Sequence, residues 1–156
     1  MEEHKKDYLN DFLCHRTRTI FGEFVKLVKD NEAREHDCYA VTIALGSDDF
    51  VKMVLVDSIF LIEFLLRYGG GGGVHQFKAN FNFNQWLIIY IMHEICFLEN
   101  QLPFFILHEL FDLARVYVNE KRVSLIDLIY VFFKSTYEVS SKIKHFVDLI
   151  NKNSKM

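Results

Sequence analysis

The chain has 156 residues and a formal net charge of -3, with 18 Lys and Arg against 21 Asp and Glu. That length fits one domain, and that charge excludes a large basic surface for nucleic acid. Hydrophobic residues make up 51% of the chain, enough to build a core, and the 15% of aromatic residues leaves apolar surface for a partner or for additional sequence.

A single proline, and apolar residues that recur at spacings of three and four, predict helices along the whole chain. Near the N-terminus, five apolar side chains fall on one stripe of a single amphipathic helix. They are Leu9, Leu13, Ile20, Phe24 and Leu27. The pattern breaks near Asp30, and a shorter helix is predicted from Ala33 to Leu45, where Gly46 suits its C-terminal cap.

The next predicted helix covers residues 50–68 and is apolar around most of its circumference. Ser47 is a candidate cap for its N-terminus. At 100° per residue, Glu63 and Arg67 lie on one narrow polar edge of this helix. Asp57 falls outside that edge, towards Val and Phe side chains, so its carboxylate needs a partner.

Five consecutive glycines, Gly69 to Gly73, follow this helix. Their backbone entropy disfavours a helix, so the run is predicted to be a flexible joint. It is either a natural low-complexity loop or an engineered replacement for a longer segment. Beyond it, residues 86–98 begin at Trp86, are apolar on nearly all sides, and are predicted to form a second central helix.

The C-terminal part is predicted to contain three helices. Pro103 suits the first position of an amphipathic helix that runs to Asn119. Ser124 opens a hydrophobic helix that continues to about Phe133, and apolar residues line one face of a last helix over residues 139–150.

Together these elements predict an all-α fold, a single-domain helix bundle over residues 1–156 with a flexible glycine-rich loop at 69–73. We expect its core on the helices at 50–68 and 86–98. The apolar run in each is about 13 residues long and carries charges, whereas a bilayer span needs about 20 apolar residues. The charged N-terminus lacks the apolar stretch of a secretory signal, so a cytoplasmic location is expected.

The three cysteines, Cys14, Cys38 and Cys96, are odd in number and widely spaced. This pattern favours reduced, mostly buried thiols over a disulfide framework. His93 and Cys96 could supply two zinc ligands, but no second pair has comparable spacing, and neither His93 nor His108 completes a zinc-protease motif. The sequence therefore predicts no metal and no cofactor.

A catalytic or metal-binding alternative stays open, because carboxylates and histidines occur along the helices at 50–68 and 86–112. Two carboxylates can act as general acid and base when the fold holds them at a suitable separation, which a sequence does not measure. The candidate residues are Asp57, Glu63, His93, Glu99, His108 and Asp112.

The segment 98–105 interrupts two very apolar helices with polar residues. Glu99 lies near a helix C-terminus, where the helix dipole disfavours its charge, so it needs a specific partner. Asn100 tolerates a left-handed cap, and Pro103 can start the next helix. The segment is either a tight structural corner or a partner site. We hypothesise that Asp57 and Glu99 are buried, bound by backbone N–H groups or an Arg, and fix how the two apolar helices meet.

The residues Leu98-Glu99-Asn100-Gln101-Leu102-Pro103-Phe104-Phe105-Ile106-Leu107, followed by 109–113, resemble the hallmark of the plant family called domain of unknown function family 247. Residues 50–57 and 60–63 resemble the second conserved block of that family. The resemblance covers most of residues 5–150. Relatives usually carry a Phe-x-x-Pro-Trp segment. In this chain residues 69–84 replace it, and only the tryptophan, Trp86, is kept. The chain thus resembles a truncated member.

The resemblance implies a non-enzymatic protein-recognition or signalling scaffold, because no enzymatic activity is established for the family. Some grass members are implicated in self-incompatibility. It also implies a protein partner, no nucleic acid, and membrane association of full-length relatives through sequence that this chain lacks. The candidate structural or partner-binding residues are Asp57, Glu63, Trp86, Glu99, Asn100, Gln101, Pro103, Phe104 and Phe105.

Overall fold

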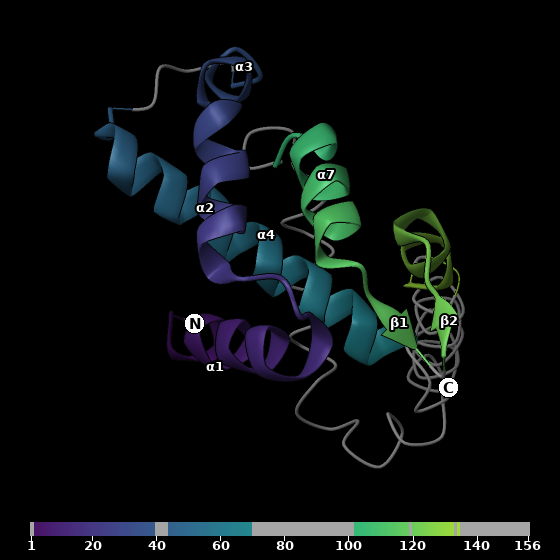
Figure 1. The fold of residues 1–156 in the computed structure, drawn as a ribbon. Helices are drawn as coiled ribbons and strands as arrows, with labels where there is room; N and C mark the ends of the chain where they lie inside the picture. Colours follow the sequence, from purple (N-terminus) through teal and green to yellow (C-terminus); the bar gives the residue numbers. More distant parts are fainter. Residues whose placement is uncertain (1, 40–43, 70–101, 119, 133, 135–156) are drawn as a thin grey trace, which may run out of the picture.

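The computed structural model of the chain describes residues 2–39, 44–69, 102–118, 120–132 and 134 (Figure 1). The helices are α1 (Glu2–Asp11), the π-helix η1 (Phe12–Arg16), α2 (Phe21–Asp30), α3 (Glu32–His36), α4 (Ser47–Gly69) and α7 (Phe104–Ala114), and residues 125–132 are also helical. The strands are β1 (Tyr117–Val118) and β2 (Lys121–Arg122). The predicted all-α fold is confirmed, with one very short hairpin added to it.

Helix α4 is the central element of the described fold. The helices α1, α2 and α7 all pack against it (Figure 1). Its buried side chains point to several sides, as expected for a helix that is apolar around most of its circumference. They are Phe50, Val51, Val54, Leu55, Ile59, Phe60, Ile62, Phe64, Leu65 and Leu66. The second predicted central helix, at residues 86–98, lies outside the described residues.

The N-terminal segment forms α1, the π-helix η1 directly after it, and a separate α2, rather than the single helix predicted. The chain is extended at Thr17, with φ of −133° and ψ of 151°, and it turns between η1 and α2. The Thr17 and Thr19 hydroxyls donate to the carbonyls of Ala114 (2.9 Å) and Leu113 (2.8 Å), at the C-terminal end of α7. These bonds satisfy carbonyls that the end of a helix leaves without partners. As a result Ile20, expected on a buried stripe, is 72% exposed.

The predicted helix from Ala33 to Leu45 is also corrected, because α3 ends at His36. Gly46 does not cap it. Instead, the Gly46 carbonyl accepts the Phe50 N–H at 2.9 Å and so opens α4. The Ser47 hydroxyl, predicted as a cap, donates to a Glu32 carboxylate oxygen at 2.6 Å and ties the start of α4 to α3.

The helix that begins after Pro103 ends at Ala114, five residues earlier than predicted. Arg115 has a φ of 48°, and this left-handed residue terminates the helix and leads into the hairpin. Tyr117 pairs with Arg122 across the hairpin. The helix predicted to open at Ser124 is present, and the Ser124 carbonyl accepts the N–H of Leu128 at 3.2 Å.

Two further expectations concern the cysteines and the membrane. Cys14 and Cys38 are free thiols, but both are exposed, so the expectation of mostly buried thiols is wrong for these two. Cys96 lies outside the described residues. Over the part of the chain that the structure describes, each helix is too short or too polar to cross a bilayer.

Candidate functional site

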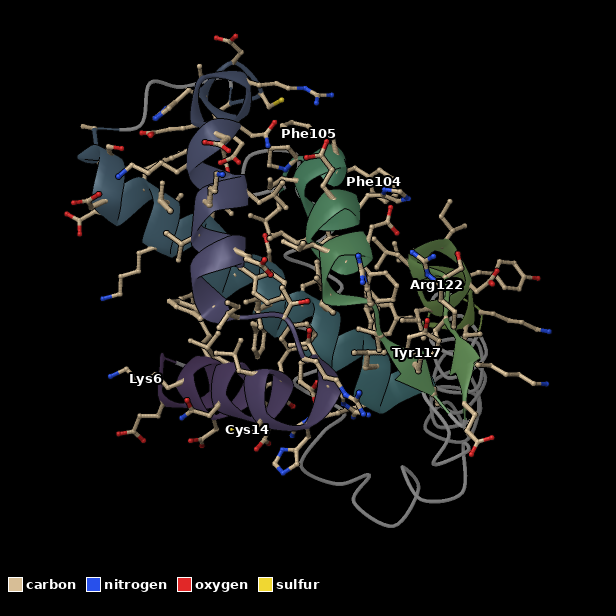
Figure 2. The ribbon with its side chains drawn as sticks, in the orientation of Figure 1. Lys6, Cys14, Phe104, Phe105, Tyr117 and Arg122 are labelled. Carbon is tan, nitrogen blue, oxygen red and sulfur yellow. The ribbon has the colours of Figure 1, made fainter. Side chains whose placement is uncertain are left out.

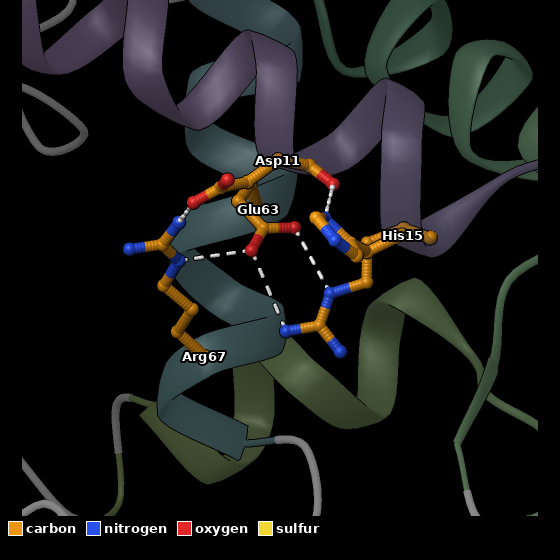
Figure 3. A network of polar contacts seen from close by, with 5 residues as sticks. Asp11, His15, Glu63 and Arg67 are labelled. Carbon is orange, nitrogen blue, oxygen red and sulfur yellow. Dashed lines mark hydrogen bonds and ion pairs between the residues drawn. The ribbon is translucent and has the colours of Figure 1, made fainter.

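Glu63 on α4 is bound by two arginines that approach from different elements (Figure 3). Arg16, the last residue of η1, donates from Nε to Glu63 Oε2 at 3.1 Å and from Nη2 to Oε1 at 3.4 Å. Arg67, one helical turn along α4, donates from Nε to Oε1 at 2.9 Å. The Glu63 side chain is 2% exposed, so its predicted place on a wet edge is wrong. Arg16, distant in sequence, helps to cover it.

The Arg67 guanidinium extends this network to α1. Its Nη2 donates to Asp11 Oδ2, and the central carbon of the guanidinium, Cζ, lies 3.9 Å from the centroid of the Tyr8 ring. Burial alone would lower the pKa of Arg67, but hydrogen bonds and charges, first among them the bond to Glu63, outweigh burial and raise it. We call Tyr8, Asp11, Arg16, Glu63 and Arg67 the α1–α4 clamp. Two guanidiniums and two carboxylates balance its charge.

Asp57 on α4 also contacts the N-terminal helix. Lys5 Nζ lies 2.7 Å from Asp57 Oδ1. The expected partner is therefore present, but it is a lysine of α1, and the aspartate side chain is 34% exposed rather than buried. Asp57 thus joins α4 to α1, whereas Glu99, the other half of the hypothesis, lies outside the described residues.

Glu35 on α3 is fully buried, and neither of its carboxylate oxygens has a hydrogen-bond partner. Burial, and to a smaller extent the negative charges of Glu32 and Glu109, together raise the pKa of Glu35 to about 7. Glu35 is not among the residues predicted from the sequence, because it lies in a charged run that is typical of a solvated surface. The next residue, His36, stacks on Phe50 with ring centroids 3.8 Å apart, which brings this part of α3 against the start of α4.

The motif residues after the undescribed corner divide between core and surface. Pro103 is buried and precedes α7, with its carbonyl accepting the Ile106 N–H at 3.2 Å. Phe105 is half-buried beneath Arg34, whose guanidinium carbon lies 3.7 Å from the ring centroid. Phe104 is 52% exposed at the start of α7 (Figure 2). Pro103 and Phe105 are therefore covered by the fold, whereas about half of the Phe104 side chain is open to solvent.

The remaining candidate residues of that motif lie outside the described part of the chain. They are Trp86, Glu99, Asn100 and Gln101.

The catalytic and metal-binding alternative depends on carboxylates and histidines that meet. Among the described residues, no hydrogen bond or ion pair joins Asp57, Glu63 and His108 to one another. His108 does meet one other candidate, Asp112, because its Nδ1 lies 3.4 Å from Asp112 Oδ2, but both side chains are about half exposed on the surface of α7. The described ranges also hold no group of three or more His, Cys, Asp or Glu side chains placed to bind a metal ion. His93 lies outside these ranges.

Large apolar side chains are exposed on the C-terminal elements. Ile126 and Tyr130 are 60% and 65% exposed on the helix at residues 125–132, and Val131 beside them is exposed too. Tyr117 is exposed on β1, at the opposite end of α7 from Phe104 (Figure 2). Four of the large apolar residues that solvent reaches thus lie within 15 consecutive positions, 117–131.

Comparison with known proteins connects this chain to plants. A UPF0481 protein of Arabidopsis thaliana is 27% identical over 161 residues, which cover 96% of this chain and 33% of that protein. The chain thus spans about a third of the length of the curated relative it matches. No solved structure matches it. A model of a family described as a plant protein of unknown function matches residues 1–155, so the chain belongs to domain of unknown function family 247.

Proposed function

We propose that this chain is a non-enzymatic protein-recognition scaffold. Its proposed binding surface is formed by the helix at residues 125–132 and the preceding hairpin. The observation that carries the proposal is the exposure of Ile126, Tyr130 and Val131 on one side of a helix whose other side is already in the core.

The composition of this helix supports a partner. Seven of the eight residues at 125–132 are apolar, with Asp127 as the exception. Leu125, Leu128 and Phe132 are buried and anchor the helix to the domain. A helix that is apolar all round is normally covered on all sides, so the outer side lacks the covering that its composition calls for.

The residue types also fit a protein partner. Tyrosine is enriched at protein–protein interfaces, because its ring supplies contact area and its hydroxyl can form hydrogen bonds. Tyr117 and Tyr130 are both exposed in this part of the chain. The signalling and self-incompatibility roles that the resemblance implies for some relatives would begin with such a binding step.

The catalytic alternative finds less support. Asp57 and Glu63 direct their oxygens at Lys5, Arg16 and Arg67 rather than at an open site. These pairs join α1 and η1 to α4, which is a structural task.

Capture of proteins from a plant extract tests the proposal. The immobilised chain and its Tyr130→Glu variant are compared by quantitative mass spectrometry, with Ile20→Glu as a control, since Ile20 is 72% exposed and lies at the start of α2 rather than on the helix at residues 125–132. We expect proteins that bind the wild-type chain and the control but not Tyr130→Glu. Identical sets of captured proteins on all three would overturn the proposal.

A further inference from the structure

The outer side of the helix at residues 125–132 carries an ordered pattern of apolar and charged side chains. At 100° per residue, Ile126, Tyr130, Lys134, Asp127 and Val131 fall in that order within an arc of about 140°. All five are exposed, and Lys134 is also helical. We call these five residues the outer face.

Its two charges have opposite sign and lie at opposite ends. Asp127 is near the N-terminal end of the helix and Lys134 is seven residues later, so the two lie about 20° apart around the axis. Within the described residues, neither forms an ion pair. Exposed, unpaired charges beside an apolar strip are typical of the rim of a protein interface.

This pattern distinguishes the two ways in which such a helix could meet a copy of itself. In a parallel pair, Asp127 would face aspartate and Lys134 would face lysine, which disfavours association. In an antiparallel pair, each aspartate faces a lysine. A two-fold axis midway between Tyr130 and Val131 brings both pairs into register, because residues 127 and 134 are equally distant from that point.

We propose that a second copy of this chain covers the outer face, with the two helices antiparallel about a two-fold axis. Asp127 then lies opposite the partner subunit's Lys134, and Tyr130 lies opposite the partner subunit's Val131. Such an isologous contact uses the same patch on both copies, and each charge pair occurs twice. The inference rests on the proposed function, since it names the protein that covers the same surface.

The size of the patch sets the expected strength of the dimer. The helix at residues 125–132 is about 12 Å long, and one face of it buries less than the roughly 800 Å² per partner of a typical stable interface. We therefore expect a reversible dimer with a Kd of roughly 10–100 μM.

Charge exchange with sedimentation equilibrium tests the pairing. The variants are Asp127→Lys, Lys134→Asp and the double variant that carries both, compared at about 50 mM salt to limit screening. We expect the wild-type chain to dimerise, each single variant to raise the Kd about tenfold by placing like charges opposite each other, and the double variant to recover most of the affinity. Ile20→Glu is expected to dimerise like the wild-type chain.

A wild-type chain that stays monomeric up to several hundred micromolar would overturn the proposal, as would a double variant no better than the single variants. All exchanged side chains are exposed, and matching far-UV circular dichroism spectra check that each variant folds. Failure of the dimer leaves the proposed function standing if Tyr130→Glu still loses proteins from the plant extract. If neither effect is seen, both proposals are wrong.

Discussion

The α1–α4 clamp and the outer face use charged side chains in opposite ways. In the clamp, the carboxylate of Glu63 is buried between two arginines, and the charges hold helices together. On the outer face, Asp127 and Lys134 are exposed, and apolar side chains lie between them. The charges of the clamp are thus paired with one another across helices, whereas those of the outer face have no ion-pair partner among the described residues. Changes in the clamp should therefore alter stability, and changes on the outer face should alter association.

The largest expected effect comes from Glu63→Ala. The variant leaves the Arg16 and Arg67 guanidiniums beside the core without their shared carboxylate. We expect the free energy of unfolding to fall by about 3 kcal/mol, because removing one member of a buried ion pair leaves the others uncompensated. Urea unfolding followed by circular dichroism measures it. Asp48→Ala, at an exposed ion pair with Lys29, is the control and should change stability by less than about 0.5 kcal/mol.

The second effect concerns Glu35 and depends on pH. Its pKa is about 7 in the folded chain and near the ordinary value of 4.5 in the unfolded chain, so the folded chain binds the proton more tightly. The free energy of unfolding is then highest below pH 4.5, falls as the pH rises, and reaches its lower level above pH 7. Glu35→Gln should remove this decline and stabilise the chain at pH 8 by about 2 kcal/mol.

Urea unfolding of the wild-type chain and Glu35→Gln at pH 5 and pH 8 checks this prediction. Glu32→Gln should reduce the decline only in part, because the Glu32 charge is a smaller cause of the raised pKa of Glu35 than burial. If the wild-type chain and Glu35→Gln lose stability equally between the two pH values, another group is responsible.

A smaller effect is expected at Asp57. Asp57→Ala removes the contact with Lys5, but the aspartate side chain is a third exposed, so solvent already weakens this ion pair. We expect a loss of about 0.5–1 kcal/mol in the free energy of unfolding, smaller than for Glu63→Ala. A loss as large as that of Glu63→Ala would show that the partly exposed Asp57 pair stabilises the fold as strongly as the buried Glu63 network, contrary to this prediction.

The smallest effect on stability should come from the outer face. Tyr130→Glu replaces a side chain that is 65% exposed, so the free energy of unfolding of the monomer should change by less than about 0.5 kcal/mol. Thermal unfolding at about 5 μM, below the expected Kd of the dimer, measures the monomer alone. A drop of several degrees would show that Tyr130 belongs to the fold rather than to an interface.

The sequence predicted those elements whose signals are local. The helix at α4 follows from a long apolar pattern, and the start of α7 follows from Pro103. The helix at residues 125–132 follows from its apolar run after Ser124. In each case the residues that determine the element lie within it or next to it.

The errors concern contacts between distant residues and single backbone choices. The break before α2 depends on Thr17 and Thr19, whose partners lie more than 90 positions later. Burial of Glu63 depends on Arg16, which lies 47 positions earlier. The early end of α7 depends on the left-handed conformation of Arg115. This residue is neither glycine nor asparagine, the types that usually adopt that conformation. Periodicity along the chain contains none of this information.

The threonine bonds at the end of α7 have a consequence for the order of assembly. The segment that completes this helix, at Thr17 and Thr19, leaves the ribosome long before the helix itself does. A contact of such high sequence separation closes a long loop, which slows folding. The N-terminal segment therefore cannot complete these contacts until nearly a hundred further residues have been made. Deleting that segment should loosen the domain near the hairpin, although no residue of the hairpin is changed.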